Sequence, residues 1–439
     1  MDSSHEGLPA TDSALTLESV ERAFMGLNGK LWRLAIVTGI AQFAMSIWTW
    51  QFAIFLQEAP VSLQPWQMGL TFSVGTLAAI IGYPLSGVVS DIVGRRTTMA
   101  LAFLPIFSGT LLLSLLPVWP MLLFSYALVL FGWSFILIIS RAVPADELAT
   151  HHGEDAPRKF MMVVMPAYLV DGLCPIAGGL LLKMGYDPVF LFQLAAMGSL
   201  VALLATLLFV RETLSSDNIR KARAQTVVSP RALGRDFWRF SMGMLGYYAC
   251  WGLAIPYLGP LCVDEWGVDK ITYGFTWSAF SLTTALLSYT ASGLATRRTK
   301  PALIVGLIGN SLIIGAFSLG SGAVMMLLLN IIWATPVVFW IGGERTLIVR
   351  GVTPEMKGRS LGTFQFMMSM TTLIAAPMGA LIWSFTGSLR TLWSIASVLG
   401  LVCVAFAGLA VRSIGPRGAS SQDAKTGSSP LGTTEQVSY

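Results

Sequence analysis

The stretch Gly87-Val88-Val89-Ser90-Asp91-Ile92-Val93-Gly94-Arg95-Arg96-Thr97 lies between two apolar runs, each long enough to cross a bilayer. It carries three charged residues within six positions, from Asp91 to Arg96. Glycine permits a tight turn, a carboxylate can cap a helix N-terminus, and arginine is excluded from the hydrocarbon core. The stretch therefore predicts a short cytoplasmic hairpin between two membrane helices.

The composition of the whole chain agrees with a membrane protein. Of its 439 residues, 54% are hydrophobic and 12% are charged, and the mean hydropathy is +0.68. Soluble domains carry about 25% charged residues. We therefore expect an integral, multi-pass protein of the plasma (inner) membrane, with the lipid bilayer as its main partner.

The spacing of the charged stretch resembles the signature loop of the major facilitator superfamily, Gly-x-x-x-Asp-x-x-Gly-Arg-Arg/Lys, which joins its second and third helices. The pattern is matched by Gly87, Asp91, Gly94, Arg95 and Arg96. A basic loop that only obeys the positive-inside rule would explain the arginines but not the spacing of Gly and Asp. The resemblance covers roughly residues 31–412. It implies an all-α membrane protein with twelve transmembrane helices in two pseudo-symmetric six-helix bundles.

Hydropathy predicts the same number of spans. They are expected at about 31–57, 67–90, 98–117, 121–148, 159–183, 189–211, 238–262, 272–296, 302–320, 323–349, 360–386 and 391–412. The domains that follow are a cytoplasmic tail (1–30), a first bundle (31–211), a cytoplasmic linker (212–237), a second bundle (238–412) and a disordered cytoplasmic tail (413–439). The first tail has no apolar core behind a basic start, so no cleaved signal peptide is expected, although a short interfacial helix is possible over Leu17–Leu27.

Basic residues predict the orientation of the spans. With the N-terminus inside, 23 of the 28 Lys and Arg residues fall on the cytoplasmic side. By the positive-inside rule both termini are then cytoplasmic. The formal net charge of +5 is therefore explained mostly by topology, and no nucleic-acid partner is expected.

The two halves of the chain repeat each other. Five matches occur in the same order at nearly one offset, and the polar linker lies at their midpoint. Such parallel repeats place a substrate cavity at the interface between the bundles, near mid-membrane. The matches are Trp32-Arg33 with Trp238-Arg239, Gly69-x-Thr71-x-Ser73 with Gly274-x-Thr276-x-Ser278, Tyr83-x-x-Ser86-Gly87 with Tyr289-x-x-Ser292-Gly293, Arg141 with Arg345, and Pro175 with Pro377.

Charged residues inside the apolar spans are candidate functional groups, because they are costly in a membrane. Arg141 lies in the fourth span and Asp171 in the fifth, at similar depth on helices expected to be neighbours. We interpret Arg141 as part of a site for an anionic substrate and Asp171 as its proton-coupling partner. The alternative is a structural ion pair inside the first bundle, which is usually no gain in stability.

Glu344 and Arg345 occupy the matching place in the tenth span. As neighbours on a helix they point about 100° apart, so one is expected to face the cavity and the other the cytoplasmic gate. We assign Arg345 to substrate binding and Glu344 to the gate. The resemblance further implies that the signature loop latches to charges on neighbouring helices, which gives an inner gate of Gly87, Asp91, Gly94, Arg95, Arg96, Asp146, Glu147 and Glu344.

Polar and aromatic residues of the first and seventh spans are further candidates for the substrate site. Gln42, Tyr248 and Trp251 lie deepest and are the residues chosen, ahead of Trp48, Trp50, Gln51 and Tyr247. Most aromatic residues in such spans only pack or anchor.

Several classes of function are disfavoured. The three histidines lie outside the apolar runs, the four cysteines are scattered singly, and there is no Walker loop. The chain is therefore not expected to be an enzyme or an ATP-driven pump. No cofactor or metal is expected either. The sequence predicts a monomeric secondary transporter that works by alternating access and moves a small organic anion, a carboxylate, together with a proton.

Two alternatives remain open at this point. The first is a proton-coupled exporter of amphipathic drugs or metabolites, because Gly172-x-x-Pro175-x-x-Gly178-Gly179 partly resembles the motif of superfamily exporters. In that stretch Cys174 stands where the motif has glycine. The second is a receptor or sensor that binds a ligand without moving it.

Overall fold

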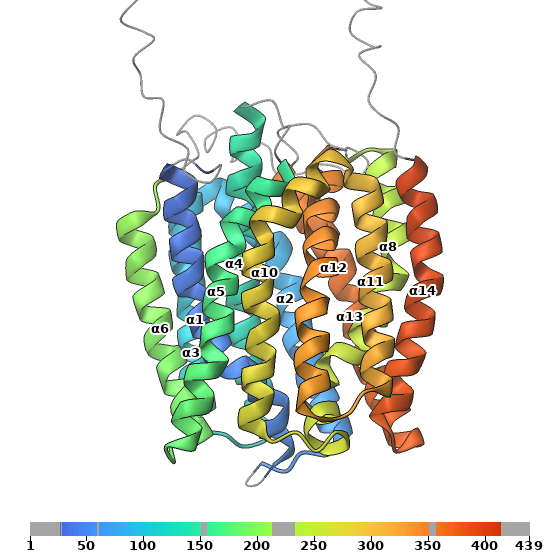
Figure 1. Ribbon diagram of the computed structural model, residues 1–439. Coiled ribbons are helices and arrows are strands. Elements are labelled where there is room, and N and C mark those ends of the chain that lie inside the picture. The colour runs from blue at the N-terminus through green and yellow to red at the C-terminus, as the bar shows by residue number, and fades with distance from the viewer. Residues whose placement is uncertain are drawn as a thin grey trace, which may run out of the picture.

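The computed structural model describes Leu27 and residues 29–58, 61–150, 156–212, 233–350 and 357–413 (Figure 1). Within these ranges the chain is built from long helices. The first bundle contains α1 (Gly29–Gln57), α2 (Pro65–Val93), α3 (Arg95–Leu115), α4 (Met121–Thr150), α5 (Ala156–Lys183) and α6 (Pro188–Phe209). The second contains α8 (Arg235–Ala254), α10 (Lys270–Arg297), α11 (Thr299–Leu319), α12 (Gly322–Arg350), α13 (Lys357–Thr386) and α14 (Leu389–Ser413). The expected tails and most of the linker lie outside the described residues.

The lengths of these helices follow from the solvent that surrounds them. In lipid, every backbone N–H and C=O must be satisfied inside the chain, and a single helix does this along its whole length. Ten of the described helices are long and apolar enough to cross a membrane. The other two long helices, α8 and α10, are not among the ten. The expected count of twelve spans is therefore resolved only in part, while the multi-pass architecture is confirmed.

The seventh span differs from the expected single helix. It runs as α8 to Ala254 and then continues through the short segments η2 (Ile255–Tyr257), α9 (Leu258–Pro260) and η3 (Leu261–Glu265). Pro256 and Pro260 lie in this segment, and proline supplies no N–H to a helix, so the regular helix stops before them.

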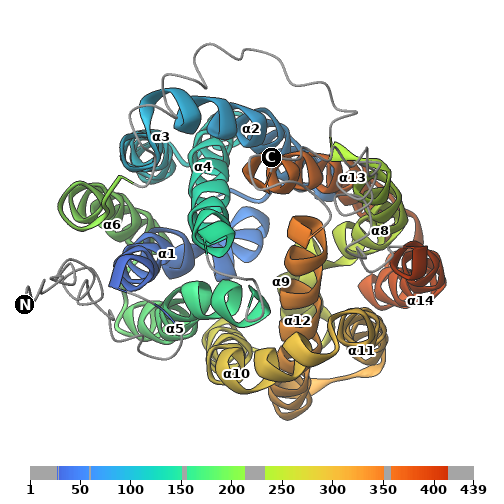
Figure 2. The ribbon, with the colours of Figure 1, turned by 90° about the horizontal axis from the view of Figure 1, so that it is seen from above.

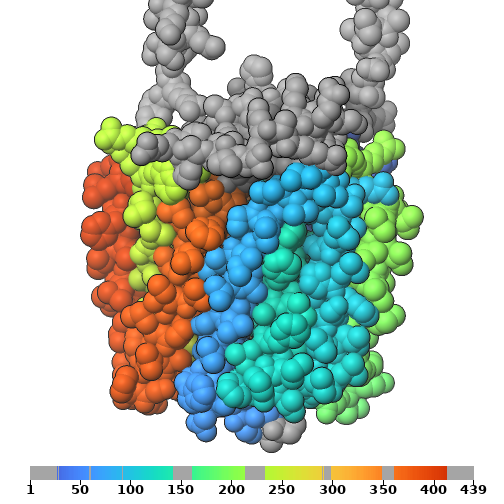
Figure 3. All heavy atoms as spheres, turned by 180° about the vertical axis from the view of Figure 1, so that it is seen from behind, coloured from blue at the N-terminus to red at the C-terminus, as the bar shows by residue number. Residues whose placement is uncertain are grey.

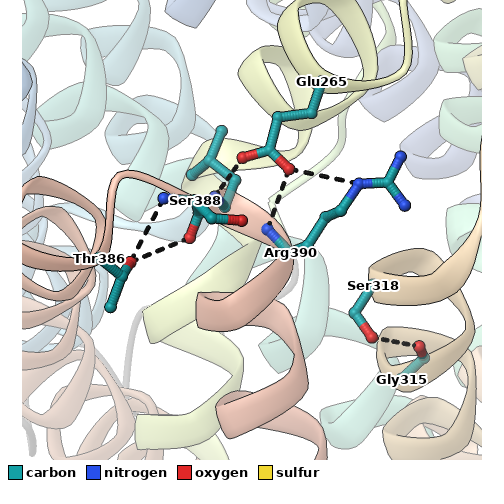
Figure 4. Close-up of polar contacts among 7 residues, drawn as sticks. Glu265, Gly315, Ser318, Thr386, Ser388 and Arg390 are labelled. Carbon is teal, nitrogen blue, oxygen red and sulfur yellow. Dashed lines mark hydrogen bonds and ion pairs between the residues drawn. The ribbon is translucent and has the colours of Figure 1, made fainter.

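The end of the broken segment is tied to the last helix. The Glu265 carboxylate accepts hydrogen bonds from the backbone N–H groups of Leu389 and Arg390, and the Nε atom of Arg390 lies 3.5 Å from it (Figure 4). Because an acidic group stabilises a helix N-terminus, this contact fixes η3 against the start of α14.

The two bundles have the same internal packing (Figure 2). In the first, α1 contacts α5 and α6, α4 contacts α2 and α3, and α3 contacts α6. In the second, α8 contacts α13 and α14, α12 contacts α10 and α11, and α11 contacts α14. Each contact in one bundle thus has its counterpart in the other. The pseudo-symmetry that the sequence repeats predicted is confirmed.

The bundles meet chiefly through two pairs of helices, α5 with α10 and α2 with α13, and less extensively through α4 with α13 and α5 with α12. Figure 3 shows the second pair from behind, with the orange α13 beside the blue α2. Two glycines of the sequence repeat lie at these contacts. A Cβ atom on Gly69 would lie 3.2 Å from Ala380 Cβ, and one on Gly274 would lie 3.2 Å from the Pro175 carbonyl oxygen. The repeated glycines therefore allow the helices of opposite bundles to approach closely.

The signature stretch is not the loop that the sequence suggested. Gly87 lies inside α2, which continues to Val93, and Gly94 alone separates α2 from α3. Gly94 has φ of +105°, a conformation that side chains disfavour. The expected hairpin with glycine at both ends is therefore wrong for Gly87 and correct for Gly94.

The helix α1 begins and α14 ends on the same face of the molecule, called here the termini face (Figure 1, top). On the opposite face the two bundles are joined by polar contacts. Gln57 Nε2 donates a hydrogen bond to Asp264 at 2.7 Å, and Lys270 pairs with Glu58. Both contacts connect the end of α1 with the second bundle, so polar side chains bridge the bundles on this face.

Candidate functional site

A cavity of about 250 Å³ lies between the bundles and is lined by α1, α4, α5 and α12. Four of the residues singled out in the sequence reach it, although they are far apart in the chain. We call it the arginine cavity; its polar lining includes Gln42, Ser140, Arg141, Tyr168, Asp171 and Arg345. Ligand sites combine a concave surface with a few convergent polar groups, and this cavity has that character.

Arg141 is contributed by α4 and reaches the other bundle. Its terminal nitrogen donates a hydrogen bond to Gln365 Oε1 of α13 at 2.7 Å. Its Nε atom is buried and has no hydrogen-bond partner. Gln365 was not predicted from the sequence, because a glutamine in an apolar helix carries no charge to draw attention to it.

Arg345 is contributed by α12 of the second bundle and is 9% exposed. One of its terminal nitrogens is buried without a partner. Neither Arg141 nor Arg345 takes part in the ion pairs of Lys270 with Glu58 and of Arg390 with Glu265. A buried charge without a partner is unfavourable. The cavity therefore presents two guanidinium groups that are available to an anion.

Asp171 is contributed by α5 and is held by neutral donors. Its carboxylate accepts hydrogen bonds from Gln42 Nε2 at 3.3 Å and from the hydroxyl groups of Ser46 and Ser281. Ser281 belongs to α10, so this contact joins the two bundles. In the described residues Asp171 is bonded to these neutral groups and Arg141 to Gln365, so the two do not form the alternative structural ion pair.

Glu344 is held by two side chains of the second bundle. Its Oε2 atom accepts hydrogen bonds from Tyr248 Oη and Trp340 Nε1, both at 2.8 Å, and the residue is 7% exposed. These contacts place its carboxylate inside the second bundle, although Glu344 directly precedes Arg345 in the chain. Arg345 is the member of the pair that lines the cavity, and the gate role of Glu344 stays a prediction.

Tyr248 and Trp251 are not among the residues that line the arginine cavity. Tyr248 is committed to Glu344, as described above. The Trp251 ring packs 4.9 Å from Trp340 and 5.6 Å from Trp333, measured between ring centroids. The structure thus gives both residues contacts behind the cavity wall, and their expected contact with substrate stays a prediction.

A second cavity, of about 290 Å³, is lined by both bundles and also includes Asp171. We call it the aromatic cavity; its rings are Trp50, Phe52, Phe72, Tyr126, Tyr273 and Trp277. Of the aromatic candidates from the sequence, Trp50 is here. Trp48 is fully buried among rings of the first bundle, and Tyr247 and Gln51 are buried at 2% and 3% exposure.

The predicted inner gate is described only in part. The side chains of Asp91, Asp146 and Glu147 lie outside the described residues. The Glu212 carboxylate accepts hydrogen bonds from the backbone N–H groups of Arg95 at 3.0 Å and Arg96 at 3.2 Å. The Arg95 side chain donates to Ser90 Oγ at 2.9 Å, and that of Arg96 donates to the Leu207 carbonyl. The two arginines thus contact Ser90 of α2, Leu207 of α6 and Glu212.

Glu212 was missed in the sequence, where it reads as the first residue of the linker. Its carboxylate occupies the space beside Gly94, because a Cβ atom added there would lie 2.3 Å from Glu212 Oε2. A carboxylate at the N-terminus of α3 is stabilised by the helix dipole. An acidic residue directly after an apolar span, opposite a Gly-Arg-Arg turn, was the signal available in the sequence.

Comparison with known proteins gives relatives and structural neighbours. No family model matches the chain. The enterobactin exporter EntS of Shigella flexneri is 25% identical over 357 residues, which cover 79% of this chain and 83% of the exporter. The enterobactin exporter EntS of Escherichia coli O81 matches to the same extent.

Among solved structures, the human organic anion transporter MFSD10 (TETRAN) aligns with a TM-score of 0.65 and 16% identity, covering 86% of this chain and 99% of that one. The nucleoside transporter NupG aligns with a TM-score of 0.63 and 15% identity, covering 89% and 100%. The fold and the two-bundle arrangement are therefore shared with these transporters.

Proposed function

Since this chain is a secondary transporter of the major facilitator superfamily and not an enzyme, we propose that it moves a small organic anion together with a proton. The anion, a monocarboxylate, binds between Arg141 and Arg345. The proton binds Asp171. Alternating access follows from rocking of the two bundles around this site.

One observation carries the proposal of an anion site. Two arginines from opposite bundles line one cavity, and each has a buried nitrogen without a hydrogen-bond partner. Arginine binds carboxylates by donating two parallel hydrogen bonds. An anion between the bundles would accept such bonds from an arginine on each side. Because each bundle contributes one arginine, a bound anion also connects the two bundles, which move relative to each other during transport.

Charge balance supports the coupling to a proton. Arg141, Arg345 and Asp171 line the cavity, and Glu344 follows behind its wall as the chain neighbour of Arg345. When all four are ionised, they carry two positive and two negative charges. A proton on Asp171 leaves the site with one excess positive charge, and a monoanion restores neutrality. Since unbalanced charge inside a membrane is costly, the proton and the anion favour each other's binding.

The hydrogen bonds of Asp171 support a link between proton binding and movement. Its carboxylate accepts from Ser281 across the α5–α10 interface. A protonated carboxyl group has less capacity to accept, because one oxygen becomes a donor. Proton binding therefore changes a bond between the bundles at the place where they meet.

A second candidate function is export of amphipathic compounds. It is favoured by the exporter relatives and by the six aromatic rings of the second cavity. The direction of transport distinguishes the two candidates. Accumulation of a carboxylate on the alkaline side supports symport. Movement of the compound toward the acidic side, opposite to the flow of protons, supports export.

The test uses purified protein in sealed proteoliposomes with an imposed pH gradient and labelled monocarboxylates. We expect accumulation on the alkaline side by the wild type. Asp171→Asn should lose this accumulation and keep exchange, because the anion site remains positive without a proton. Asp187→Asn is a matched control, because Asp187 is an exposed residue that caps the N-terminus of α6 and does not line the arginine cavity. Unchanged accumulation by Asp171→Asn removes this residue from the mechanism, and retained uptake by Arg141→Ala removes the anion site.

A further inference from the structure

The two cavities share one side chain of their linings. Asp171 belongs to the lining of the arginine cavity and to that of the aromatic cavity. Their volumes are about 250 and 290 Å³. Sites for small molecules usually have volumes of roughly 300–1,000 Å³. Each cavity alone is below that range and the sum of the two volumes is within it, which favours a single ligand that passes Asp171 and occupies both.

The aromatic cavity is built to receive a ring. Phe52 and Tyr126 are stacked with their centroids 4.8 Å apart, and Phe72 lies edge-on to Tyr126 at 6.0 Å. On the other bundle, Tyr273 and Trp277 lie 6.5 Å apart. Rings that already contact each other form firm walls, and an aromatic ligand gains both burial and ring contacts between them.

The charges are divided unequally between the cavities. Asp171 is the charged residue in the lining of the aromatic cavity, whereas the arginine cavity has Arg141 and Arg345 as well. A second anionic group placed among the rings would lose its hydration and meet the Asp171 carboxyl without a cation beside it. The arrangement therefore selects against dianions.

From these observations we infer that the substrate is an amphipathic aromatic monocarboxylate. Its carboxylate lies between the two arginines, its ring lies in the aromatic cavity, and a short linker passes Asp171. This inference rests on the proposed anion site and adds the part of the ligand that gives specificity. Both bundles contact both ends of such a molecule.

The experiment measures dissociation constants of purified protein for a matched series. The ligands are propanoate, 3-phenylpropanoate, phenylsuccinate and the neutral 3-phenylpropanamide. We expect 3-phenylpropanoate to bind roughly ten- to a hundredfold more tightly than propanoate, because the ring is buried. The dianion and the amide should both bind more weakly than 3-phenylpropanoate, the first for its second charge and the second for lack of one.

Two variants assign the gain to the cavity. Trp277→Ala and the bulkier Trp277→Leu should reduce the preference for the phenyl compound, measured as the ratio of the dissociation constants of propanoate and 3-phenylpropanoate. Trp66→Ala is the matched control, because Trp66 is 56% exposed and lies outside both cavities. Equal affinity for propanoate and 3-phenylpropanoate, or a preference that survives both Trp277 variants, overturns the inference and leaves the anion site intact. Failure of every carboxylate to bind, or binding that is indifferent to Arg345→Gln, overturns the proposed function instead.

Discussion

Replacing Arg345 by glutamine removes a buried charge from the second bundle without breaking any hydrogen bond or ion pair of the described residues. One terminal nitrogen of Arg345 is buried and unpartnered. The ligand-free protein should therefore keep its melting temperature or gain a little. Arg141→Gln should behave differently, since it removes the donor to Gln365 and leaves a buried acceptor without its partner.

The magnitude for the ligand-bound protein follows from the contact that Arg345 offers. A hydrogen bond to a charged group contributes about 1.5–3 kcal/mol. Its loss weakens binding roughly 10- to 150-fold, since each 1.4 kcal/mol is tenfold. A ligand at a hundred times its dissociation constant stabilises the wild type by about 2.7 kcal/mol. If the dissociation constant rises a hundredfold, the same concentration stabilises the variant by only about 0.4 kcal/mol.

The assay is thermal unfolding of purified protein with and without a carboxylate that stabilises the wild type. Arg390→Gln serves as the control, because Arg390 is an arginine of the opposite face that pairs with Glu265. The control should keep the full ligand-induced shift. The anion-site reasoning is refuted if Arg345→Gln also keeps it. A large loss of stability in the ligand-free variant would show that Arg345 has a structural partner.

Three further outcomes are expected. Gly94→Ala should lower the melting temperature by an amount equivalent to about 1–3 kcal/mol, because the added Cβ atom would meet Glu212 and the residue has a positive φ. Gly87→Ala should not lower it, because the space around Gly87 is open. Equal melting temperatures of the two variants would contradict this. Transport of a monocarboxylate with one proton should be electroneutral, so clamping the membrane potential with valinomycin should leave the initial rate unchanged, and a clear dependence on potential would exclude one-to-one coupling. A disulfide between cysteines at Glu58 and Lys270, which pair across the bundles, should stop transport until it is reduced, and full activity of the cross-linked protein would show that this face does not open.

The predictions from the sequence succeeded where a local property decides the outcome. The helix α3 begins at Arg95 and α6 at Pro188, within a few residues of the expected starts at 98 and 189. An apolar run of sufficient length has one stable form in lipid, so its ends are readable. The seventh span shows the limit of this reasoning, because its hydropathy continued through Pro256 and Pro260 although its helix did not.

The candidate site was predicted in its charges and not in its contacts. Arg141, Asp171 and Arg345 were identified because charged residues stand out in apolar spans. Gln365 and Ser281 were not, since uncharged polar residues are common in membrane helices and most of them bond to their own backbone. In the same way, the sequence placed Tyr248 at the substrate and Glu344 at the gate, and the structure bonds them to each other.

By itself the sequence determined that the chain crosses a membrane many times, that its halves repeat, and which charged residues lie at depth. These properties depend on the length and composition of each segment, which are local. Only the tertiary structure decided that Asp171 meets Ser281 of the other bundle, and that Arg345 faces the cavity while Glu344 faces away. The physical reason is that the rotation of each helix about its axis is set by packing against helices distant in the chain, and no single segment carries that information.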